Sequence, residues 1–266
     1  MKIYTRPVID SDKEKCIWIE QGATPGLSYV SDVWESFTKG DSGEFSAAFY
    51  GGYLGGMGKL TRLYDSYAWL ETLRVHPNYQ GKGLGKAIYD RYIEQMQEMN
   101  LSAVGMYTNY DNIVSRTLAE KYGLSVKARF SEYTKFDFEM PKTIGNTLKP
   151  VTETSLNRAD LGSFIVLNRT FYPVCEGLAK ILVQNNWIYE SDCGIIIMGY
   201  RFQPQKALHI AYMKGDNNKL LAHACIKAAE IGAKSLTAMH PYDNECESEF
   251  LQSRGFTKNP TDYITL

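Results

Sequence analysis

Three glycines at alternate positions, Gly81, Gly83 and Gly85, precede a segment with the pattern of a helix. Glycine is unfavourable in regular structure unless the chain needs a positive φ or a ligand must approach the backbone closely. The first N–H groups of a helix have no partner within it, and the helix dipole is positive at that end. A glycine-rich loop that leads into a helix is therefore a candidate phosphate-binding site.

Two common phosphate-binding motifs do not fit this loop. A dinucleotide-binding fingerprint reads G-x-G-x-x-G, but after Gly81 and Gly83 the third glycine comes at Gly85, one position too early. A Walker A loop reads G-x-x-x-x-G-K-[S/T], whereas here the glycines are one residue too close and Ala87 stands in place of the hydroxyl residue. The spacing therefore excludes both motifs.

Helical and extended patterns alternate on both sides of the loop. Before the loop we expect a strand, two short helices and three strands, and after it a helix, a strand, a helix and a last strand. The predicted ranges are 2–8, 10–21, 31–38, three runs within 44–77, and then 85–99, 101–108, 111–123 and 124–138. This order predicts an α/β (α+β) fold with a mixed central β-sheet flanked by helices.

The chain contains an internal repeat. The tripeptide YDN occurs at 110–112 and at 242–244, and a glycine follows each copy at the same distance. A helical and then an extended segment precede each tripeptide. We therefore predict two copies of one fold, over 1–138 and 148–266, with a linker at 137–150. The second copy has YMKGDNN in place of the glycine-rich loop, so only the first should hold phosphate in this way.

The composition is that of a globular protein without a membrane span. Hydrophobic residues make up 44% of the 266 residues, but no apolar run is long enough to cross a bilayer. A formal charge of −1 and a pI of about 6.4 argue against a nucleic-acid or membrane partner. The first residues lack the apolar segment of a secretory signal, and the cysteines are dispersed, so we expect a cytoplasmic protein. The four scattered histidines argue against a metal site.

With its flanks, the loop resembles a motif of a known superfamily. The segment LETLRVHPNYQGKGLGKAI matches the [Q/R]-x-x-G-x-[G/A] pyrophosphate loop of the GNAT superfamily of acyl-CoA N-acyltransferases. The segment TNYDNIVSRTLAEKYGL is similar to the family's N-x-x-[A/S]-x-x-x-Y-x-x-x-G-F element, so the resemblance covers most of residues 3–136. Tandem GNAT proteins are known in the superfamily, and this chain resembles one with a degenerate C-terminal copy.

The resemblance implies a site for acetyl-CoA as co-substrate, without a metal. Backbone amides of the loop would hold the pyrophosphate of coenzyme A, and the preceding strand would pair with the pantetheine arm as an added β-strand would. Asn112 and Ser115 fall where the family contacts the lower part of that arm. The implied coenzyme-binding residues are Leu73, Val75, Gln80, Gly81, Lys82, Gly83, Leu84, Gly85, Lys86, Asn112 and Ser115.

Acyl transfer to an amine needs a base, because an amine with a pKa of about 9 or 10 is mostly protonated at neutral pH. Glu71 is the predicted catalytic residue, and alternation along its strand places it on the same side as Leu73 and Val75. The alternative for Glu71 is a structural ion pair with Arg74 or Arg62. A backbone amide between Leu73 and Val75 is predicted to polarise the thioester carbonyl.

The general acid is left unassigned. Many family members use a tyrosine four residues before the glycine of the second motif, and this chain has Ala119 there. Tyr122 lies next to that glycine and faces elsewhere on the helix, so it is not put forward. Tyr107 and Tyr110 are substitutes by position only.

The two early helices usually select the acceptor in this fold. Tyr29 and Trp34 are predicted to contact a small cationic acceptor, and the alternative is an ordinary amphipathic helix pair. The implied function is transfer of an acetyl group from acetyl-CoA to an amino acid or other small amine, by direct attack in a ternary complex. The alternative is a non-catalytic acyl-CoA-binding module. The second copy is expected to serve a structural role, and a homodimer is left open.

Overall fold

The computed structural model describes residues 1–39, 42–138, 148–152 and 161–266. Its contacts divide the chain into two compact units. The first consists of residues 1–106, 113–125 and Leu266, and the second of residues 107–112 and 126–265. Most of the predicted linker lies outside the described residues, and the predicted domain limits stay predictions.

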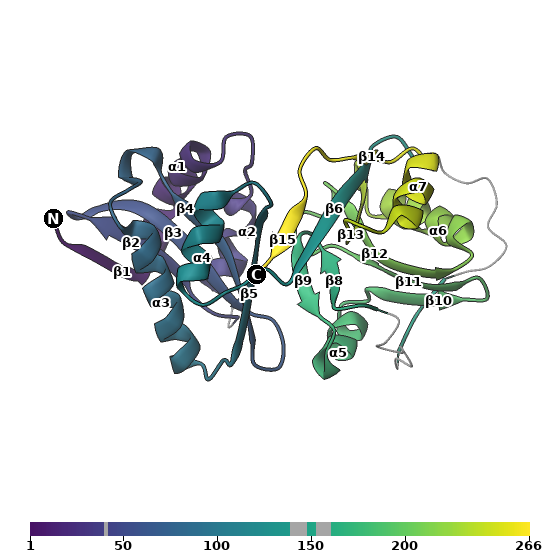
Figure 1. Cartoon of the computed structure of the whole chain (residues 1–266), viewed down its shortest axis with the longest axis horizontal. Helices are drawn as coiled ribbons and strands as arrows, with labels where there is room; N and C mark the ends of the chain where they lie inside the picture. The colour runs from purple at the N-terminus through teal and green to yellow at the C-terminus, as the bar shows by residue number, and fades with distance from the viewer. Residues whose placement is uncertain (40–41, 139–147, 153–160) are drawn as a thin grey trace. The chain divides into compact units, whose positions relative to one another are not determined.

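The first unit is a mixed sheet covered by helices (Figure 1). The strand order is β1-β2-β3-β4-β5, and neighbours are antiparallel except for the parallel pair β4 and β5. Its elements are β1 (Ile3–Pro7), α1 (Lys13–Ala23), α2 (Val30–Thr38), β2 (Phe45–Tyr50), β3 (Tyr53–Arg62), β4 (Tyr67–Val75), α3 (Leu84–Glu98), β5 (Ala103–Asn109) and α4 (Ile113–Lys121). The predicted order of elements in this half is confirmed.

Helix α3 packs closely on one face of this sheet. Its residues Ile88 and Tyr92 are almost fully buried, as their helical spacing predicts. They fit because Gly58 of β3 has no side chain: an added Cβ would lie 2.2 Å from the Tyr92 hydroxyl. The next residue, Lys59, points the other way and donates to the Phe37 carbonyl of α2, 3.3 Å away. Helices α2 and α3 therefore cover opposite faces.

The second unit repeats the parallel strand pair joined by a helix. Strands β12 and β13 are parallel with α6 between them in sequence, just as α3 lies between β4 and β5. The elements are β6 (Ala128–Lys135), β7 (Lys149–Pro150), β8 (Phe164–Leu167), β9 (Thr170–Pro173), α5 (Glu176–Gln184), β10 (Ile188–Ser191), β11 (Gly194–Gly199), β12 (Leu208–Gly215), α6 (Asn217–Glu230), β13 (Leu236–Pro241), α7 (Glu245–Ser253), β14 (Thr257–Lys258) and β15 (Tyr263–Thr265). Among the described residues, no helix is long and apolar enough to cross a membrane.

Strand β6 pairs with strands from the second half of the sequence. The sequence pattern predicts this strand at the end of the first copy, yet β6 lies antiparallel to both β13 and β15. Strand β15 in turn pairs with residues 107–109 of β5. A local hydrophobic pattern predicts that a segment is extended, but it does not identify the strand's partner.

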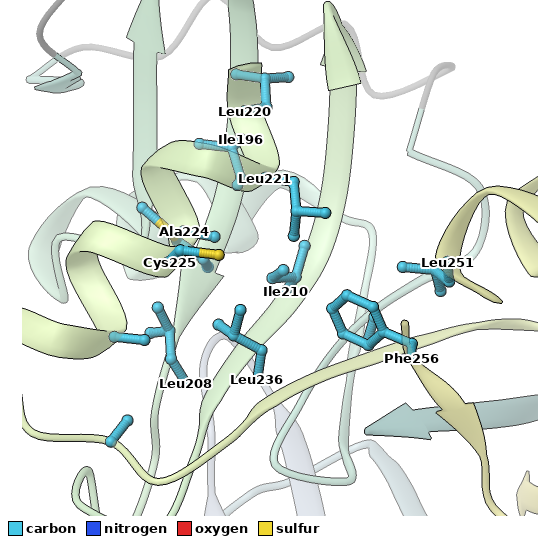
Figure 2. Packing of buried hydrophobic residues seen from close by; sticks show 14 of the residues in the cluster. Ile196, Leu208, Ile210, Leu220, Leu221, Ala224, Cys225, Leu236, Leu251 and Phe256 are labelled. Atoms are coloured by element: carbon cyan, nitrogen blue, oxygen red, sulfur yellow. The ribbon is translucent and has the colours of Figure 1, made fainter. Parts of the chain in front are cut away.

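The core of the second unit lies between its sheet and α6 (Figure 2). Side chains from strands β11, β12 and β13 meet those of α6, and a leucine of α7 and a following phenylalanine belong to the same cluster. The labelled members are Ile196, Leu208, Ile210, Leu220, Leu221, Ala224, Cys225, Leu236, Leu251 and Phe256. The helix and the sheet thus bury their apolar faces against each other.

A buried histidine lies beside this core. His209 of β12 shares a hydrogen bond with the Thr237 hydroxyl of the neighbouring strand β13. Burial lowers the pKa of His209 to about 4, so the folded protein holds it as a neutral imidazole at neutral pH. This side chain therefore serves the packing of the second unit.

The Gly58→Ala variant tests the packing of α3. The added methyl group would collide with Tyr92 and Ile88, so we expect the free energy of unfolding to fall by about 1–3 kcal/mol. Gly56 in the same strand is the matched control, because its added Cβ would come no closer than 3.3 Å to a neighbouring atom. Urea unfolding should show a smaller loss for Gly56→Ala. Equal losses would contradict the close contact of Gly58 with α3.

The His209→Gln variant tests the neutral imidazole. Unfolded His209 takes up a proton below about pH 6.5, whereas the folded side chain does so only near pH 4. Folding stability is therefore lost as the pH falls through this interval. Removing His209 should abolish about 1–3 kcal/mol of that pH dependence, measured by urea unfolding at pH 6.5 and 4.5. The same pH dependence in both proteins would show that His209 titrates normally.

Candidate functional site

Strand β4 carries a bulge in its second half. Thr72 has a φ of +59°, and the β3–β4 register shifts between Met57 and Lys59. A bulge bends its strand and changes the direction of side chains. The described pairing of β4 with β5 ends at Leu70 and Met106, although β4 continues further. The last part of β4 therefore presents a backbone edge that is not paired with β5.

Glu71 is buried beside the bulge. Its carboxylate accepts a hydrogen bond from the Thr61 hydroxyl of β3, 2.5 Å away, and only 8% of the residue is exposed. Arg74 donates to the Thr24 hydroxyl at the end of α1 and to the Leu73 carbonyl. Glu71 is thus held on the sheet by a neutral donor, in a position from which a carboxylate can accept a proton.

The bulge changes which side chains share a face of β4. Glu71 bonds to Thr61 on the face covered by α2, whereas Val75 lies beside Ile88 of α3, next to Gly56. The predicted alternation, with Glu71 and Val75 on one side, is therefore wrong, because the bulge at Thr72 adds a residue between them.

The glycine-rich loop ends in an uncapped helix. Gly83 has a φ of +87° and is the N-cap residue of α3, where no side chain hydrogen-bonds to the first turn. The first turn also has no acidic residue. Gln80 ties the loop to β4, because its side-chain amide donates to the Val75 carbonyl, 3.1 Å away. Among the described residues, no side chain therefore caps the first N–H groups of α3, which lie close to the end of β4, where an anion would find donors and a favourable dipole.

The two loop lysines are placed differently. Lys82 donates to the Asn78 carbonyl, 2.7 Å away, and its ammonium lies over the rings of Tyr50 and Tyr79. Lys86 is exposed in the first turn of α3. Lys82 therefore folds back onto the segment before the loop, and its predicted contact with the coenzyme is through the backbone.

Asn112 and Ser115 belong to different units. The Asn112 amide donates to the Asn109 carbonyl, which closes the turn before α4, and this segment groups with the second unit. Ser115 is half-buried on α4 in the first unit. Their joint contact with pantetheine stays a prediction.

Helix α4 is fastened to α3 by Tyr122. The Tyr122 hydroxyl donates to Asp90, 2.6 Å away, and its ring stacks on Tyr89. Burial, with the hydrogen bond to Asp90, raises the pKa of Tyr122 above its usual range. Ala119, at the position of the usual tyrosine, is completely buried. Tyr122 thus holds two helices together and is not put forward as the general acid.

Tyr29 and Trp34, the two residues predicted to contact the acceptor, lie in different surroundings. The Tyr29 hydroxyl lies 2.5 Å from the Thr72 hydroxyl at the bulge, whereas Trp34 is 2% exposed and packs against Phe45 in the core. Glu20, fully buried, accepts hydrogen bonds from the backbone amides of Tyr29 and Val30 at the start of α2. Only Tyr29 therefore remains in the candidate site. The sequence does not predict the roles of Thr61 and Thr72. A bulge at a threonine leaves no sequence signal of the kind that a glycine gives.

The corresponding helix of the second unit is capped by its own carboxylate. Asp216 accepts a hydrogen bond from the Lys219 amide at the start of α6, 3.2 Å away, and also pairs with the Lys219 ammonium. These hydrogen bonds to Lys219 lower the pKa of Asp216, so it is ionised at neutral pH. A carboxylate thus occupies the start of α6, whereas the start of α3 has no such cap.

A comparison with protein-family models finds a match in the first half of the chain. Residues 13–124 match the family model described as the acetyltransferase (GNAT) family. No curated protein sequence matches the chain significantly.

Solved structures match the chain over its whole length. A GCN5-related N-acetyltransferase from Sphaerobacter thermophilus is 14% identical, with a TM-score of 0.63, and the match covers 99% of this chain and 94% of that one. A tandem GNAT protein from the clavulanic acid biosynthesis pathway is 12% identical, with a TM-score of 0.61. This match covers 100% of this chain and 98% of that one. Structural similarity at this level of sequence identity shows a shared fold and nothing more. Residues 13–124 therefore match the acetyltransferase (GNAT) family, and the chain as a whole shares its fold with a tandem GNAT protein.

Proposed function

We propose that this protein is an N-acetyltransferase that moves an acetyl group from acetyl-CoA to the amine of a small molecule. The observation that carries the proposal is the uncapped start of α3 beside the unpaired edge of β4. The helix end suits the pyrophosphate of coenzyme A, and the edge from Leu73 to Val75 suits the amide groups of pantetheine. The two requirements for holding one acyl-CoA molecule thus meet in the first unit.

The chemistry assigns a proton acceptor and a carbonyl-binding group. Acetyl-CoA supplies the acetyl group as a thioester. Glu71 takes the proton from the ammonium of the acceptor, directly or through a water molecule, and the neutral amine attacks the carbonyl carbon. A backbone amide of the Leu73–Val75 segment stabilises the negative charge on the carbonyl oxygen until the carbon–sulfur bond breaks. The departing thiolate takes up the extra proton of the new amide nitrogen, directly or through a water molecule, so this route needs no dedicated acid.

The acceptor in this proposal is a small amine. Tyr29 lies beside the bulge of β4, where the acceptor would approach. All five cysteines are free thiols, which supports a reducing compartment such as the cytoplasm as the location. A second candidate function, acyl-CoA binding without turnover, is favoured by one observation, the buried Ala119 in place of the usual tyrosine.

The Gly83→Glu variant tests the coenzyme site. It places a carboxylate at the start of α3, so we expect the dissociation constant of acetyl-CoA to rise at least about ten-fold in calorimetric titration. Gly232→Glu is the matched control, because Gly232 also has a left-handed φ, +69° against +87° at Gly83, and its Cβ would meet open space. Unchanged affinity in Gly83→Glu would exclude the loop as the pyrophosphate site.

The Glu71→Gln variant tests the base. Thiol release from acetyl-CoA is measured against a panel of amino acids, polyamines and aminosugars. We expect kcat to fall by about 10²–10⁴-fold at neutral pH, and to recover as the pH approaches the pKa of the acceptor amine. Acetyl-CoA affinity should remain within about two-fold, because the loop is intact.

Two outcomes of this assay would revise the proposal. Release that survives in Glu71→Gln would keep the enzyme and discard Glu71 as its base. Tight binding of acetyl-CoA with no release to any acceptor would favour the binding module.

A further inference from the structure

Thr72 has a backbone conformation that its side chain disfavours. Its φ of +59° lies in the left-handed region, which is unfavourable above all for β-branched residues. The other non-glycine residues with positive φ among those described lie outside strands, and none is β-branched: Asp65, Asn100, Asn168, Arg169, Asn186 and Gln203. A strained residue of this kind persists only where its surroundings hold it, and such residues cluster at functional sites.

The side chain of Tyr29 is the contact that meets Thr72. Its hydroxyl lies 2.5 Å from the Thr72 hydroxyl, across 43 residues of sequence. The backbone of Tyr29 is fixed independently, because its amide donates to the buried Glu20 carboxylate, 3.3 Å away. Tyr29 is therefore anchored at one end to α1 and at the other to the bulge of β4.

The ladder on the other side of β4 fixes the length of the bulge. Glu71 pairs with Lys59 before it and Val75 pairs with Gly56 after it, so the extra residue must be accommodated between these positions. The ladder sets how many residues the bulge contains, and the hydroxyl of Thr72 adds a contact that bears on the conformation of the bulged residue. The hydrogen bond from Tyr29 acts on that conformation.

We propose that Tyr29 is a positioning residue whose hydrogen bond to Thr72 holds β4 in the bulged conformation that directs a backbone amide of the Leu73–Val75 segment at the thioester carbonyl. This inference rests on the proposed function and changes the predicted part of Tyr29 from acceptor binding to control of the strand. Loss of the Tyr29 hydroxyl loosens the amide that polarises the carbonyl, while the loop that binds the pyrophosphate is left as it was.

The test is an infrared difference spectrum of acetyl-CoA carrying ¹³C at the thioester carbonyl. A hydrogen bond to this oxygen lowers the stretching frequency, and the measurement needs no acceptor. We expect the band of bound acetyl-CoA to lie below that of the free molecule in the wild type. In Tyr29→Phe it should move back toward the free value, while the dissociation constant stays within about two-fold.

Changes at Thr72 distinguish positioning from direct contact. Thr72→Val keeps the branched shape without the hydroxyl and should shift the band as Tyr29→Phe does. This variant also provides the test if Tyr29→Phe folds poorly. Thr72→Gly adopts a positive φ without strain, so its band should stay near the wild-type position. Adding Tyr29→Phe to Thr72→Gly should then have little further effect.

Each contrary outcome overturns a defined statement. A band that Tyr29→Phe does not move, with acetyl-CoA bound, would overturn the positioning role and leave the proposed function standing. An equal shift from Tyr29→Phe in the Thr72→Gly background would mean that Tyr29 acts on the ligand directly, and it would also overturn the role. Absence of acetyl-CoA binding in the wild type would overturn the proposed function, and this inference with it.

Discussion

The candidate site depends on the separation of β4 from β5. The two strands are parallel and paired up to Leu70 and Met106, and beyond this point β4 bends at a left-handed Thr72. A continuous ladder would use every backbone amide of β4 for the sheet. Because the ladder stops, the last residues of β4 have backbone groups that do not pair with β5, and they lie next to the loop that leads into α3.

The two units share a helix between parallel strands, but the start of that helix differs between them. Both contain a helix between parallel strands, and in both the start of that helix is positively polarised. In α6 the carboxylate of Asp216 meets this end, whereas α3 begins at Gly83 with no side-chain cap. Glycine at the start of α3 thus gives up the stabilisation of a cap and leaves the helix end accessible.

Much of the fold could be predicted because its signals are local. The helical spacing of Ile88 and Tyr92 predicts α3, and the repeated YDN frame predicts two copies. The features that could not be predicted depend on partners distant in sequence. The pairing of β6 with β13, the burial of Trp34 and the capping of α2 by Glu20 are all of this kind. The bulge at Thr72 reversed the predicted side of Val75, because strand alternation assumes an unbroken ladder.

The central claim is that coenzyme A binds at the start of α3 and not at the start of α6. The most direct measurement is a titration of isotope-labelled protein with coenzyme A, followed through the backbone amide signals of both helix ends. We expect the signals of residues 80–86 to shift and saturate together, while those of residues 217–220 do not move. Saturating shifts at residues 217–220 without shifts at residues 80–86 would contradict the claim.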